Sequence, residues 1–565
     1  MLAFATMTRN SALRDAQPLP AALDGRSIVL TGLMGAGKTS IGRRLAARLG
    51  LPFRDADTEI EAAAGSTIPE LFERYGERAF RDGERRVVRR VLAGDPVVLA
   101  TGGGAFLDPE TRRTVRDAAV SVWLRCSLET LVRRVALRNN RPLLAGGDAA
   151  EILERLMRAR HPLYAESDIT VDCGEESPDV TTGRVLATLL TWRPPRRLAV
   201  ALGDKSYDVL VGSDLISHAG AMLAPVLPQK RAVIVTDETV AALHLATLRA
   251  ALAETAVETA DIVVPAGERS KSLESYAAVV DRLLELRVER RTAMIALGGG
   301  VVGDLAGFAA ATTLRGLPFV QIPTTLLAQV DSSVGGKVGV NTARGKNLVG
   351  AFHQPRIVLA DVGTLATLPQ RELRAGYAEV VKAGLIGDAG LFAWCEDHAA
   401  SLLRGDRELE IEAILRATAF KTQVVGEDER EEKPDGGRAL LNLGHTFAHA
   451  LERETGYGDA LLHGEAVAIG LGLAFQLSAR LGVSPEEDAA RVIDHIADVG
   501  LPAKLAMLDR RFSAASLVQH MRGDKKVRDS TLTFVLVRGI GHAYTSREVP
   551  VGAVIDLLRR EGCTA

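Results

Sequence analysis

Three histidines, His445, His449 and His463, lie within nineteen residues of a segment rich in apolar side chains. His445 and His449 stand four residues apart in a helical pattern, so both imidazoles should project from one face of a helix. Neutral imidazole is a common zinc ligand, and a catalytic zinc ion usually has three protein ligands and one open position. The spacing therefore predicts a metal site that needs a further, oxygen ligand, although histidines that simply pack in a core remain the alternative. Thr446 follows His445, which excludes the His-Glu-x-x-His pattern of zinc proteases.

A second motif with chemical meaning lies near the N-terminus. An apolar run ending at Thr31 is followed by Gly-x-x-x-x-Gly-Lys-Thr from Gly32 to Thr39 and then by a helical pattern. Strand, Gly-rich turn and helix are the context that a P-loop requires. Backbone N–H groups at the helix N-terminus close around phosphates, Lys38 reaches the outer phosphates, and the Thr39 hydroxyl can hold Mg²⁺. The motif therefore predicts a nucleotide-binding domain that transfers phosphate.

The residues after this motif bear on what receives the phosphate. They are Asp55 and Asp57 after a short apolar run, Arg81 and Glu84 on an expected helix, the glycine triplet Gly102 to Gly104, and then Arg141 and Arg160. An aspartate can fix a hydroxyl group, and arginines bind a carboxylate through two hydrogen bonds or neutralise a transferring phosphate. Each residue taken singly also fits a surface ion pair.

Together these residues closely resemble the shikimate kinase family over about residues 26 to 172. The resemblance implies that shikimate binds at Asp57, Arg81, Gly103 and Arg160, and that Asp57 also acts on the hydroxyl group that is phosphorylated. It implies an ATP site at Gly35, Ala36, Gly37, Lys38, Thr39, Ser40 and Arg141, with Arg141 in a lid. It implies Mg²⁺ bound by Thr39 with Asp55 nearby, and catalytic roles for Lys38, Asp57, Arg141 and Arg160. A gluconate or nucleotide kinase is the alternative, but it gives no reason for Arg81 and Glu84 together with the glycine triplet.

The positioning elements of the remaining chain divide into two kinds. From about residue 197 to 368, short apolar runs alternate with Ala- and Leu-rich helical patterns, which predicts an α/β layer with parallel strands. After about Pro369 the patterns become almost wholly helical. One run ends in Gly298, Gly300 and Gly303, which fits G-x-G-x-x-G, but the acidic residue about twenty positions later that would hold a ribose is missing. Asp237, at the end of another run, is a better candidate for that contact.

Lysines and carboxylates follow these runs. A stretch rich in Thr, Ser and Gly carries Asp331, Lys337, Lys346 and Asn347. Lysines beside glycine loops are suited to a phosphate or a carboxylate. Further on, Glu379 and Lys382 stand one helical turn apart. Glu379 is our expected third metal ligand, and a simple ion pair with Lys382 is the alternative.

With these residues assembled, residues 197 to 561 resemble the 3-dehydroquinate synthase family over their whole length. The resemblance implies that Glu379, His445 and His463 bind Zn²⁺ or Co²⁺, whereas His449 contacts the substrate. It implies an NAD⁺ site made by Asp237, Glu268, Lys271, Gly300, Val301, Val302, Gly303, Asp304, Thr324, Thr325, Asp331, Lys337, Lys346, Thr364 and Thr367. It implies that the substrate, the keto-acid phosphate DAHP, meets Arg315, Lys337, Asn347, Lys382, Lys421, Arg438, Asn442, His449 and Lys525 or Lys526. The expected catalytic residues are Lys337, Lys382, Lys421, Arg438 and His449.

In the implied chemistry the metal ion and NAD⁺ have different roles. A metal ion lowers the pKa of the substrate hydroxyl groups that it binds. NAD⁺ takes a hydride and later returns it, phosphate is eliminated, and ring opening with aldol closure gives 3-dehydroquinate. The loop between Lys421 and Arg438 is a few residues longer than is common, so we expect its conformation to differ.

Two other functions compete with this interpretation. A metal-dependent polyol dehydrogenase shares the expected fold, NAD⁺ and metal, but it need not bind a phosphate and a carboxylate together, which Lys337, Lys421, Arg438 and Asn442 would do. A scaffold with decayed sites is disfavoured because the chain keeps the residues that the two activities would need, which are Lys38, Asp57, Glu379, His445 and His463. The favoured hypothesis is a bifunctional enzyme that phosphorylates shikimate with ATP and converts DAHP to 3-dehydroquinate.

Length and composition set the frame for these sites. A chain of 565 residues is too long for one core. We predict a tail over residues 1–24, a P-loop domain of the nucleoside-monophosphate-kinase type over 25–172, a linker over 173–196, an NAD⁺-binding Rossmann-like α/β subdomain over 197–368 and a helical metal- and substrate-binding subdomain over 369–565. A formal net charge of −2 with no long basic run argues against nucleic acid as a partner. Four scattered cysteines and no long apolar run predict a cytoplasmic enzyme without a membrane span, and a homodimer through the synthase part is our expectation.

Overall fold

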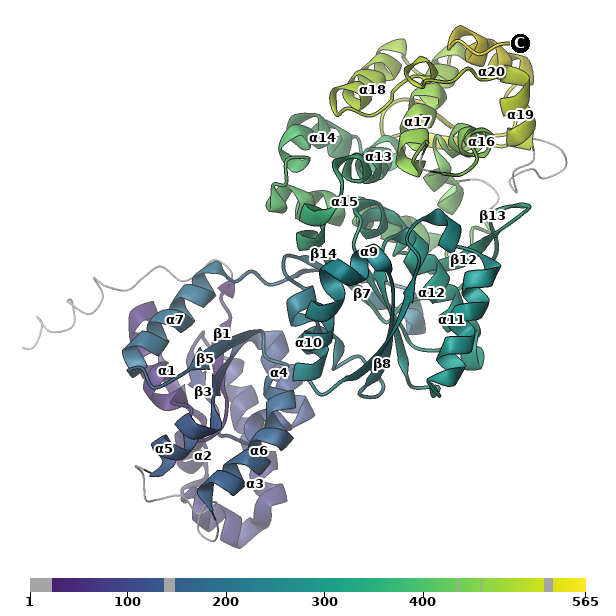
Figure 1. Cartoon of the computed structure of the whole chain (residues 1–565). Coiled ribbons are helices and arrows are strands. Elements are labelled where there is room, and N and C mark those ends of the chain that lie inside the picture. The colour runs from purple at the N-terminus through teal and green to yellow at the C-terminus, as the bar shows by residue number, and fades with distance from the viewer. Residues whose placement is uncertain (1–22, 137–147, 434–435, 459, 523–531) are drawn as a thin grey trace, which may run out of the picture. The chain divides into compact units, whose positions relative to one another are not determined.

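The computed structural model describes residues 23–136, 148–433, 436–458, 460–522 and 532–565 (Figure 1). Arg141, Lys525, Lys526 and residues 1–22 of the expected tail therefore lie outside the described residues. The chain forms two compact units; the main boundary between them falls after Pro194, and the short segments His218–Pro225 and Ala250–Val257 are grouped with the first unit. None of the helices in the described ranges is both long and apolar enough to cross a membrane.

The first unit is built on a parallel sheet. Its strands, in the described ranges, are β1 (Ser27–Thr31), β2 (Phe53–Asp55), β3 (Val98–Ala100), β4 (Ala119–Cys126) and β5 (Ile169–Cys173), in the order β2-β3-β1-β4-β5. All four neighbouring pairs are parallel. β1 and β3 are buried along their whole length, as expected for strands covered by helices on both faces. The carboxyl ends of these strands carry the P-loop, Asp55 and the glycine triplet.

Seven helices surround this sheet in the described ranges. They are α1 (Lys38–Leu49), α2 (Ala56–Ala64), α3 (Ile68–Leu92), α4 (Pro109–Ala118), α5 (Leu128–Ala136), α6 (Ala149–Tyr164) and α7 (Pro178–Thr191). The linker predicted over residues 173–196 differs from what the structure has there. α7 packs its apolar side chains Val185, Leu186 and Leu189 into the core of the first unit, which leaves residues 192–195 between this helix and β6.

The second unit begins with a seven-stranded sheet, counted over the described residues, in the order β6-β7-β14-β11-β10-β8-β9. The strands are β6 (Arg196–Val200), β7 (Tyr207–Gly212), β8 (Arg231–Asp237), β9 (Glu258–Val264), β10 (Ala293–Gly298), β11 (Phe319–Pro323) and β14 (Ile357–Asp361). The runs predicted as strands all form strands. They are parallel except for β6, which runs antiparallel to β7.

Helices and a hairpin lie between these strands along the chain. They are α8 (Ala219–Leu223), α9 (Glu238–Val240), α10 (Ala246–Glu254), α11 (Leu273–Glu285), α12 (Gly300–Thr312) and the antiparallel pair β12 (Lys337–Thr342) and β13 (Gly345–Phe352). Figure 1 shows α11 and α12 together on one side of the sheet. Their apolar residues share a core with β8 and β10.

A helical subdomain follows, as predicted after Pro369. It contains α13 (Gln370–Gly387), α14 (Ala389–Leu402), α15 (Arg407–Glu427), α16 (His445–Thr455), α17 (His463–Arg480), α18 (Glu486–Asp498), α19 (Ala514–Arg522) and α20 (Val551–Arg560), with a small hairpin of β15 (Phe534–Val537) and β16 (Ala543–Ser546). α13 and α17 are buried along most of their length, because they are apolar or small on nearly all faces. These two central helices carry two of the three expected metal ligands.

Candidate active sites

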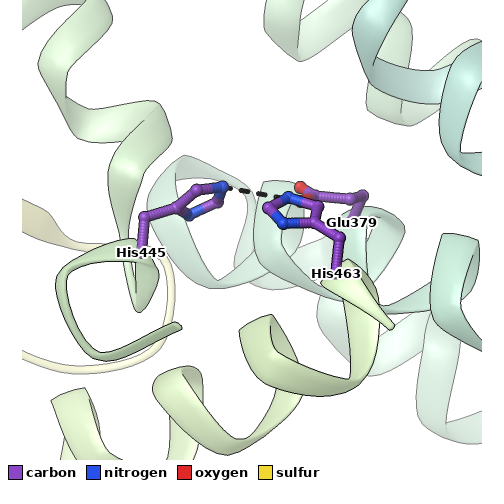
Figure 2. A group of neighbouring side chains, drawn as sticks. All are labelled: Glu379, His445 and His463. Carbon is purple, nitrogen blue, oxygen red and sulfur yellow. Dashed lines mark ion pairs between the residues drawn. The ribbon is translucent and has the colours of Figure 1, made fainter. Parts of the chain in front are cut away.

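The predicted metal ligands converge in the helical subdomain. Glu379 comes from the middle of α13, while His445 and His463 are the first residues of α16 and α17. Their ligand atoms all lie within 4.8 Å of one another. Glu379 Oε1 is 3.7 Å from His445 Nε2 and 3.6 Å from His463 Nε2. Figure 2 shows both rings directed toward the carboxylate.

These distances fit ligands that share one ion. Bonds of 2.0 to 2.2 Å in a tetrahedral arrangement place neighbouring ligand atoms about 3.4 Å apart. Glu379 is buried, and neither of its carboxylate oxygens has a hydrogen-bond partner of normal geometry among the described residues. The Lys382 ammonium group pairs with the same carboxylate. The ion pair that was the alternative role of Glu379 therefore coexists with the metal-ligand arrangement.

Both imidazoles are held by their other ring nitrogen. His445 Nδ1 lies 3.1 Å from the carbonyl oxygen of Leu443, and His463 Nδ1 lies 3.3 Å from Glu452 Oε2. A ring nitrogen that donates to a carbonyl or carboxylate leaves the opposite nitrogen free to bind a metal ion. Although burial alone lowers it, Glu452 and Glu379 raise the pKa of His463 to about 10. The two carboxylates thus stabilise positive charge at this position, and a metal ion that binds there takes the place of the proton on Nε2, because only neutral imidazole is a metal ligand.

His449 occupies a different position. Its ring centroid is 5.4 Å from that of His445 and 6.4 Å from that of His463. It is not among the residues whose ligand atoms cluster. As the spacing of four residues predicted, His445 and His449 lie near each other. The residues grouped with His445 as candidate metal ligands are His463 and Glu379.

The basic residues expected to meet DAHP form ion pairs around this cluster. Buried Lys421 donates to Asp331 Oδ1 at 2.7 Å and to the Asp331 carbonyl oxygen at 2.6 Å. Burial raises the pKa of Asp331, but Lys421 and Lys382 outweigh it and hold that pKa well below its usual range. Buried Arg438 donates to the carbonyl oxygens of Gly335 and Glu429 at 3.0 and 2.6 Å. These cations are fixed before any anion arrives.

Glu431 is a residue at this site that the sequence analysis missed. Its carboxylate contacts the Lys337 ammonium group and accepts a hydrogen bond of 3.1 Å from Asn442 Nδ2. It lies in the loop between Lys421 and Arg438, with a left-handed φ of 59°. The sequence shows Glu431 as one of several acidic residues in a loop. Its contacts with Lys337 and Asn442 depend on the loop conformation, so no sequence pattern could predict them.

The residues expected at NAD⁺ lie largely along the carboxyl edge of the seven-stranded sheet. Asp237 ends β8, Gly300 to Asp304 begin α12 directly after β10, Thr324 and Thr325 follow β11, and Thr364 and Thr367 follow β14. Ligands of open α/β sheets bind outside this edge. Lys271 pairs with Asp304 at 2.5 Å. Lys346 pairs with Glu268 at 3.3 Å, which links the hairpin to the same edge.

Some of these residues have other contacts in the structure. Asp237 accepts from the backbone N–H groups of Thr239 and Val240 and so caps α9. The buried Thr364 hydroxyl donates to the Asp361 carbonyl oxygen at 2.8 Å. The backbone N–H of Asn347 donates to Asn341 at 3.1 Å.

Arg315 stands apart from the others. It follows α12 and precedes β11, whereas the site gathers where α12 begins and β11 ends. Because a helix rises 1.5 Å per residue, the length of α12 separates Arg315 from Gly300 by about 20 Å. The structure does not bring Arg315 to the other predicted DAHP residues of its own chain.

In the first unit, the P-loop encloses its own lysine. Lys38 donates to the carbonyl oxygens of Gly32 and Leu33 at 2.7 and 3.0 Å, inside the loop at the start of α1. Ala36 lies in the loop, and Ser40 is the third residue of α1. Gly35 and Gly37 have left-handed φ values of 85° and 95°. The Thr39 hydroxyl donates to Asp55 Oδ2 at 2.8 Å, so the two residues expected at Mg²⁺ are in contact.

The glycine triplet is where the expected shikimate residues meet. A Cβ atom at Gly102 would lie 2.8 Å from Asp57 Oδ1 and 2.9 Å from Glu84 Oε1, and one at Gly104 would overlap the Arg81 guanidinium group. Gly102 and Gly104 are therefore needed because charged side chains approach the backbone closely, whereas a Cβ atom at Gly103 would lie at an ordinary contact distance of 3.5 Å from Arg160. Arg160 reaches the same turn.

Hydrogen bonds and ion pairs order these charged groups. Arg160 Nη1 donates to the Gly103 carbonyl oxygen at 2.9 Å, and the Tyr164 hydroxyl donates to the same oxygen at 2.5 Å. Arg81 pairs with buried Glu84 at 2.7 Å. Burial raises the pKa of Glu84, while Arg81 lowers it. Arg81 and Arg160 are thus each held in place at the glycine triplet, which Asp57 also approaches.

Arg134 is a second residue that the sequence analysis missed. Its guanidinium group lies 3.5 Å from the P-loop carbonyl oxygens of Gly35 and Ala36 and donates to the Gly174 carbonyl oxygen at 2.5 Å. It lies near the end of α5, where a pair of arginines reads as ordinary surface charge. No spacing in the sequence connects it with the loop.

Comparisons with known families and proteins assign a family to each part of the chain. Residues 34–190 match the family described as Shikimate kinase. Residues 261–375 and 376–527 match 3-dehydroquinate synthase N-terminal and 3-dehydroquinate synthase C-terminal. A 3-dehydroquinate synthase of Rhodospirillum rubrum is 55% identical over 364 residues, which are 64% of this chain and 94% of that protein.

Two solved structures resemble the second unit. One is the 2-epi-5-epi-valiolone synthase ValA of Streptomyces hygroscopicus, with NAD⁺ and Zn²⁺ bound; its TM-score is 0.58 and its identity 34%, over 64% of this chain and 98% of that chain. The other is a 2-deoxy-scyllo-inosose synthase with carbaglucose-6-phosphate, NAD⁺ and Co²⁺; its TM-score is 0.59 and its identity 26%, over 65% and 100%. The chain belongs to the 3-dehydroquinate synthase family and carries a shikimate kinase domain before that region. It is a bifunctional fusion with the shikimate kinase and 3-dehydroquinate synthase activities of the shikimate pathway.

Proposed function

We propose how the residues of the second unit share the synthase reaction. Glu379, His445 and His463 hold one divalent ion, Zn²⁺ or Co²⁺. The observation that carries this assignment is that both Nε2 atoms face one buried carboxylate while each Nδ1 is held from behind. When bound, the ion acidifies substrate hydroxyl groups, and NAD⁺ along the sheet edge accepts and returns a hydride.

The chain's own residues bind and orient DAHP. Buried cations are costly without partners, and Glu379 and Asp331 pair with Lys382 and Lys421 until the substrate anions arrive. Arg438, Lys337 and the Asn442 amide extend this cationic surface, and they bind the phosphate and carboxylate. His449 lies beside the ligands and contacts the substrate. The backbone contacts of Arg438 fix the direction of its guanidinium group. Ion pairs and hydrogen bonds bind the phosphate without covalent attachment, so it can leave after it is eliminated.

In the first unit we propose that ATP with Mg²⁺ and shikimate bind on either side of the glycine triplet. Lys38 contacts the outer phosphates, and Thr39 with Asp55 holds Mg²⁺. Arg81 and Arg160 bind the shikimate carboxylate, and the Asp57 carboxylate accepts the proton of the attacking hydroxyl group. Arg141 is proposed as a lid residue on the resemblance alone.

The synthase proposal is tested by phosphate release from DAHP with and without NAD⁺. We expect release only when NAD⁺ is present and no net accumulation of NADH, because the hydride is returned in each turnover. A polyol dehydrogenase would instead reduce NAD⁺ stoichiometrically with glycerol. That result, or phosphate release that is independent of NAD⁺, would contradict the proposal.

The kinase proposal is tested by Asp57→Asn. The amide keeps the size of the side chain but cannot accept a proton, so shikimate phosphorylation should fall by about 10²-fold or more while ATP binding persists. Glu59→Gln is the matched control, because Glu59 lies on the same helix and pairs with Arg54 and Arg90 on the surface. Equal loss of ATP binding in Asp57→Asn would assign Asp57 to the Mg²⁺ site.

We also propose that the second unit forms a homodimer. What supports it is Arg315, which the resemblance implies at DAHP although it lies about a helix length from that site in its own chain. A second copy would let this arginine act across subunits. Light scattering should give twice the chain mass, and Arg315→Ala mixed with Glu379→Ala should regain part of the synthase activity. A monomeric mass with no regained activity would refute the dimer.

A further inference from the structure

Glu452 is a buried carboxylate that bridges two functional residues. It lies on α16, seven residues after His445, and only 2% of its surface is exposed. Its Oε1 atom is 3.0 Å from Lys346 Nζ, and its Oε2 atom is 3.3 Å from His463 Nδ1. Each carboxylate oxygen therefore has a different partner, one from the hairpin and one from α17.

The contact with His463 controls which ring nitrogen carries a proton. An ionised carboxylate accepts but cannot donate, so it fixes a proton on Nδ1. The Nε2 lone pair is then left facing Glu379 Oε1 at 3.6 Å. His445 obtains the same result from the backbone carbonyl oxygen of Leu443, which no substitution of a side chain can remove. Only the His463 contact can be tested by changing its partner.

The contact with Lys346 explains how a carboxylate is tolerated in this core. A buried charge is strongly unfavourable unless it is paired. Lys346 comes from β13 and also pairs with Glu268 at 3.3 Å, while its ammonium group lies 5.0 Å from the centroid of the Tyr457 ring. Glu452 thus joins a metal-ligand candidate of the helical subdomain to the edge of the α/β layer where NAD⁺ is proposed to bind.

We propose that Glu452 is a positioning residue of the synthase site, which holds the His463 imidazole in its metal-binding orientation and links it through Lys346 to the nucleotide edge. The inference rests on the proposed metal site. It assigns to Glu452 no contact with the metal ion or the substrate. Its effect is expected in metal affinity and ligand geometry before any effect on turnover.

The test uses Glu452→Gln in the full chain and compares it with the unchanged protein. Gln keeps the side-chain size but removes the charge, so metal affinity measured by competition with a chelator should fall about 10- to 100-fold. The visible spectrum of the Co²⁺-loaded protein should shift, because the orientation of one imidazole changes. Shikimate kinase activity of the same sample should be unaltered.

Glu454→Gln is the matched control. Glu454 lies two residues further on the same helix and also pairs with a histidine, His520, at 2.7 Å, and it accepts from the Ser516 hydroxyl at 2.8 Å. It contacts no metal-ligand candidate in these interactions. We expect its metal affinity and Co²⁺ spectrum to equal those of the unchanged protein, and an equal loss in both variants would overturn the inference.

The remaining outcomes are also decisive. Wild-type affinity and an unchanged spectrum in Glu452→Gln overturn the inference, while His445→Ala separates this failure from failure of the metal site itself. Loss of metal in His445→Ala leaves the proposed site standing; retention refutes it. If Glu452→Gln does not fold, Glu452→Asp keeps the charge but draws it back from His463, and wild-type metal affinity in that variant overturns the inference.

Discussion

The three histidines of α16 and α17 have similar sequence contexts but different surroundings, which allows a test of their roles. His445 and His463 face Glu379, whereas the His449 ring lies to the side of both. Replacing any of Glu379, His445 or His463 by Ala should nearly abolish bound metal, while His449→Ala should keep it and lose turnover. Elemental analysis of the purified variants measures this. A metal-free His449→Ala beside a metal-replete His445→Ala would reverse the assignment.

We expect Glu410, on α15, to make the stability of the second unit depend on pH. Burial raises its pKa from an ordinary value of 4.5 to about 7, although Arg407 lowers it. Between these two pH values the folded chain keeps a proton that the unfolded chain releases, so the free energy of unfolding falls as pH rises through this window. The side chain of Glu410→Gln cannot ionise, so the free energy of unfolding of this variant should exceed that of the wild type by up to about 3 kcal/mol at pH 8.

Urea unfolding at a series of pH values checks this prediction. The advantage of Glu410→Gln should shrink as pH is lowered from 8 to 5, because the wild-type carboxyl group is then neutral in the folded chain. Glu408→Gln, on the same helix, is the control, since its side chain is exposed and pairs with Arg196. An advantage that does not depend on pH would contradict the explanation.

At the residue scale, the sequence predicted side chains whose position follows from a motif. The P-loop and its neighbours are examples, because strand, turn and helix fix where Lys38 and Thr39 lie. Glu431, Glu452 and Arg134 could not be predicted in this way. Their contacts depend on a loop conformation or on packing between distant segments, which no local spacing records.

At the element scale, α3 contains a break that matters for the kinase site. Gly76 lies inside this helix with φ 74° and ψ 172°, a backbone conformation available essentially to glycine alone. Arg81 and Glu84 follow it on the same helix. Gly76→Ala should destabilise the first unit by about 1–3 kcal/mol and raise the KM for shikimate, because the direction of the segment that carries Arg81 would change.

Gly83 provides the matched control for Gly76. It lies on the same helix without a left-handed φ, and a Cβ atom at either position would meet nothing within 4 Å. Gly83→Ala should therefore stabilise the unit by about 0.5–1 kcal/mol. Urea titration followed by kinase activity measures both variants. Equal effects of the two substitutions would show that the backbone conformation at Gly76 is unimportant.

Strands were the elements most open to prediction. The apolar runs of the second unit are short and bounded by Gly, Pro and Asp, and a buried parallel sheet leaves that pattern. The position of α7 was harder. Its flanking segments are polar or rich in Pro, which indicated a linker, but Val185, Leu186 and Leu189 pack into the first core. The sequence predicts a short helix here, but it does not indicate which surface that helix packs against.

At the scale of the whole molecule, two activities share one chain without sharing an intermediate. The synthase gives 3-dehydroquinate, and dehydration and reduction lie between that product and shikimate. Direct transfer between the sites is therefore not expected. Each unit has its own core, and the main boundary after Pro194 leaves α7 complete on one side and β6 complete on the other.

We therefore predict two independent active sites. Lys38→Ala should abolish the kinase and leave the synthase unchanged, because it removes only a phosphate contact within the first unit. Glu379→Ala should abolish the synthase and leave the kinase unchanged. Both rates are measured on the same sample of each variant, so every variant supplies its own control.

The chain divided between Pro194 and Pro195 should give two soluble halves that each keep about their full rate, since neither core is cut. If either half is insoluble, or regains most of its rate only when the other is added back, the two units depend on each other for folding or activity and the prediction is wrong.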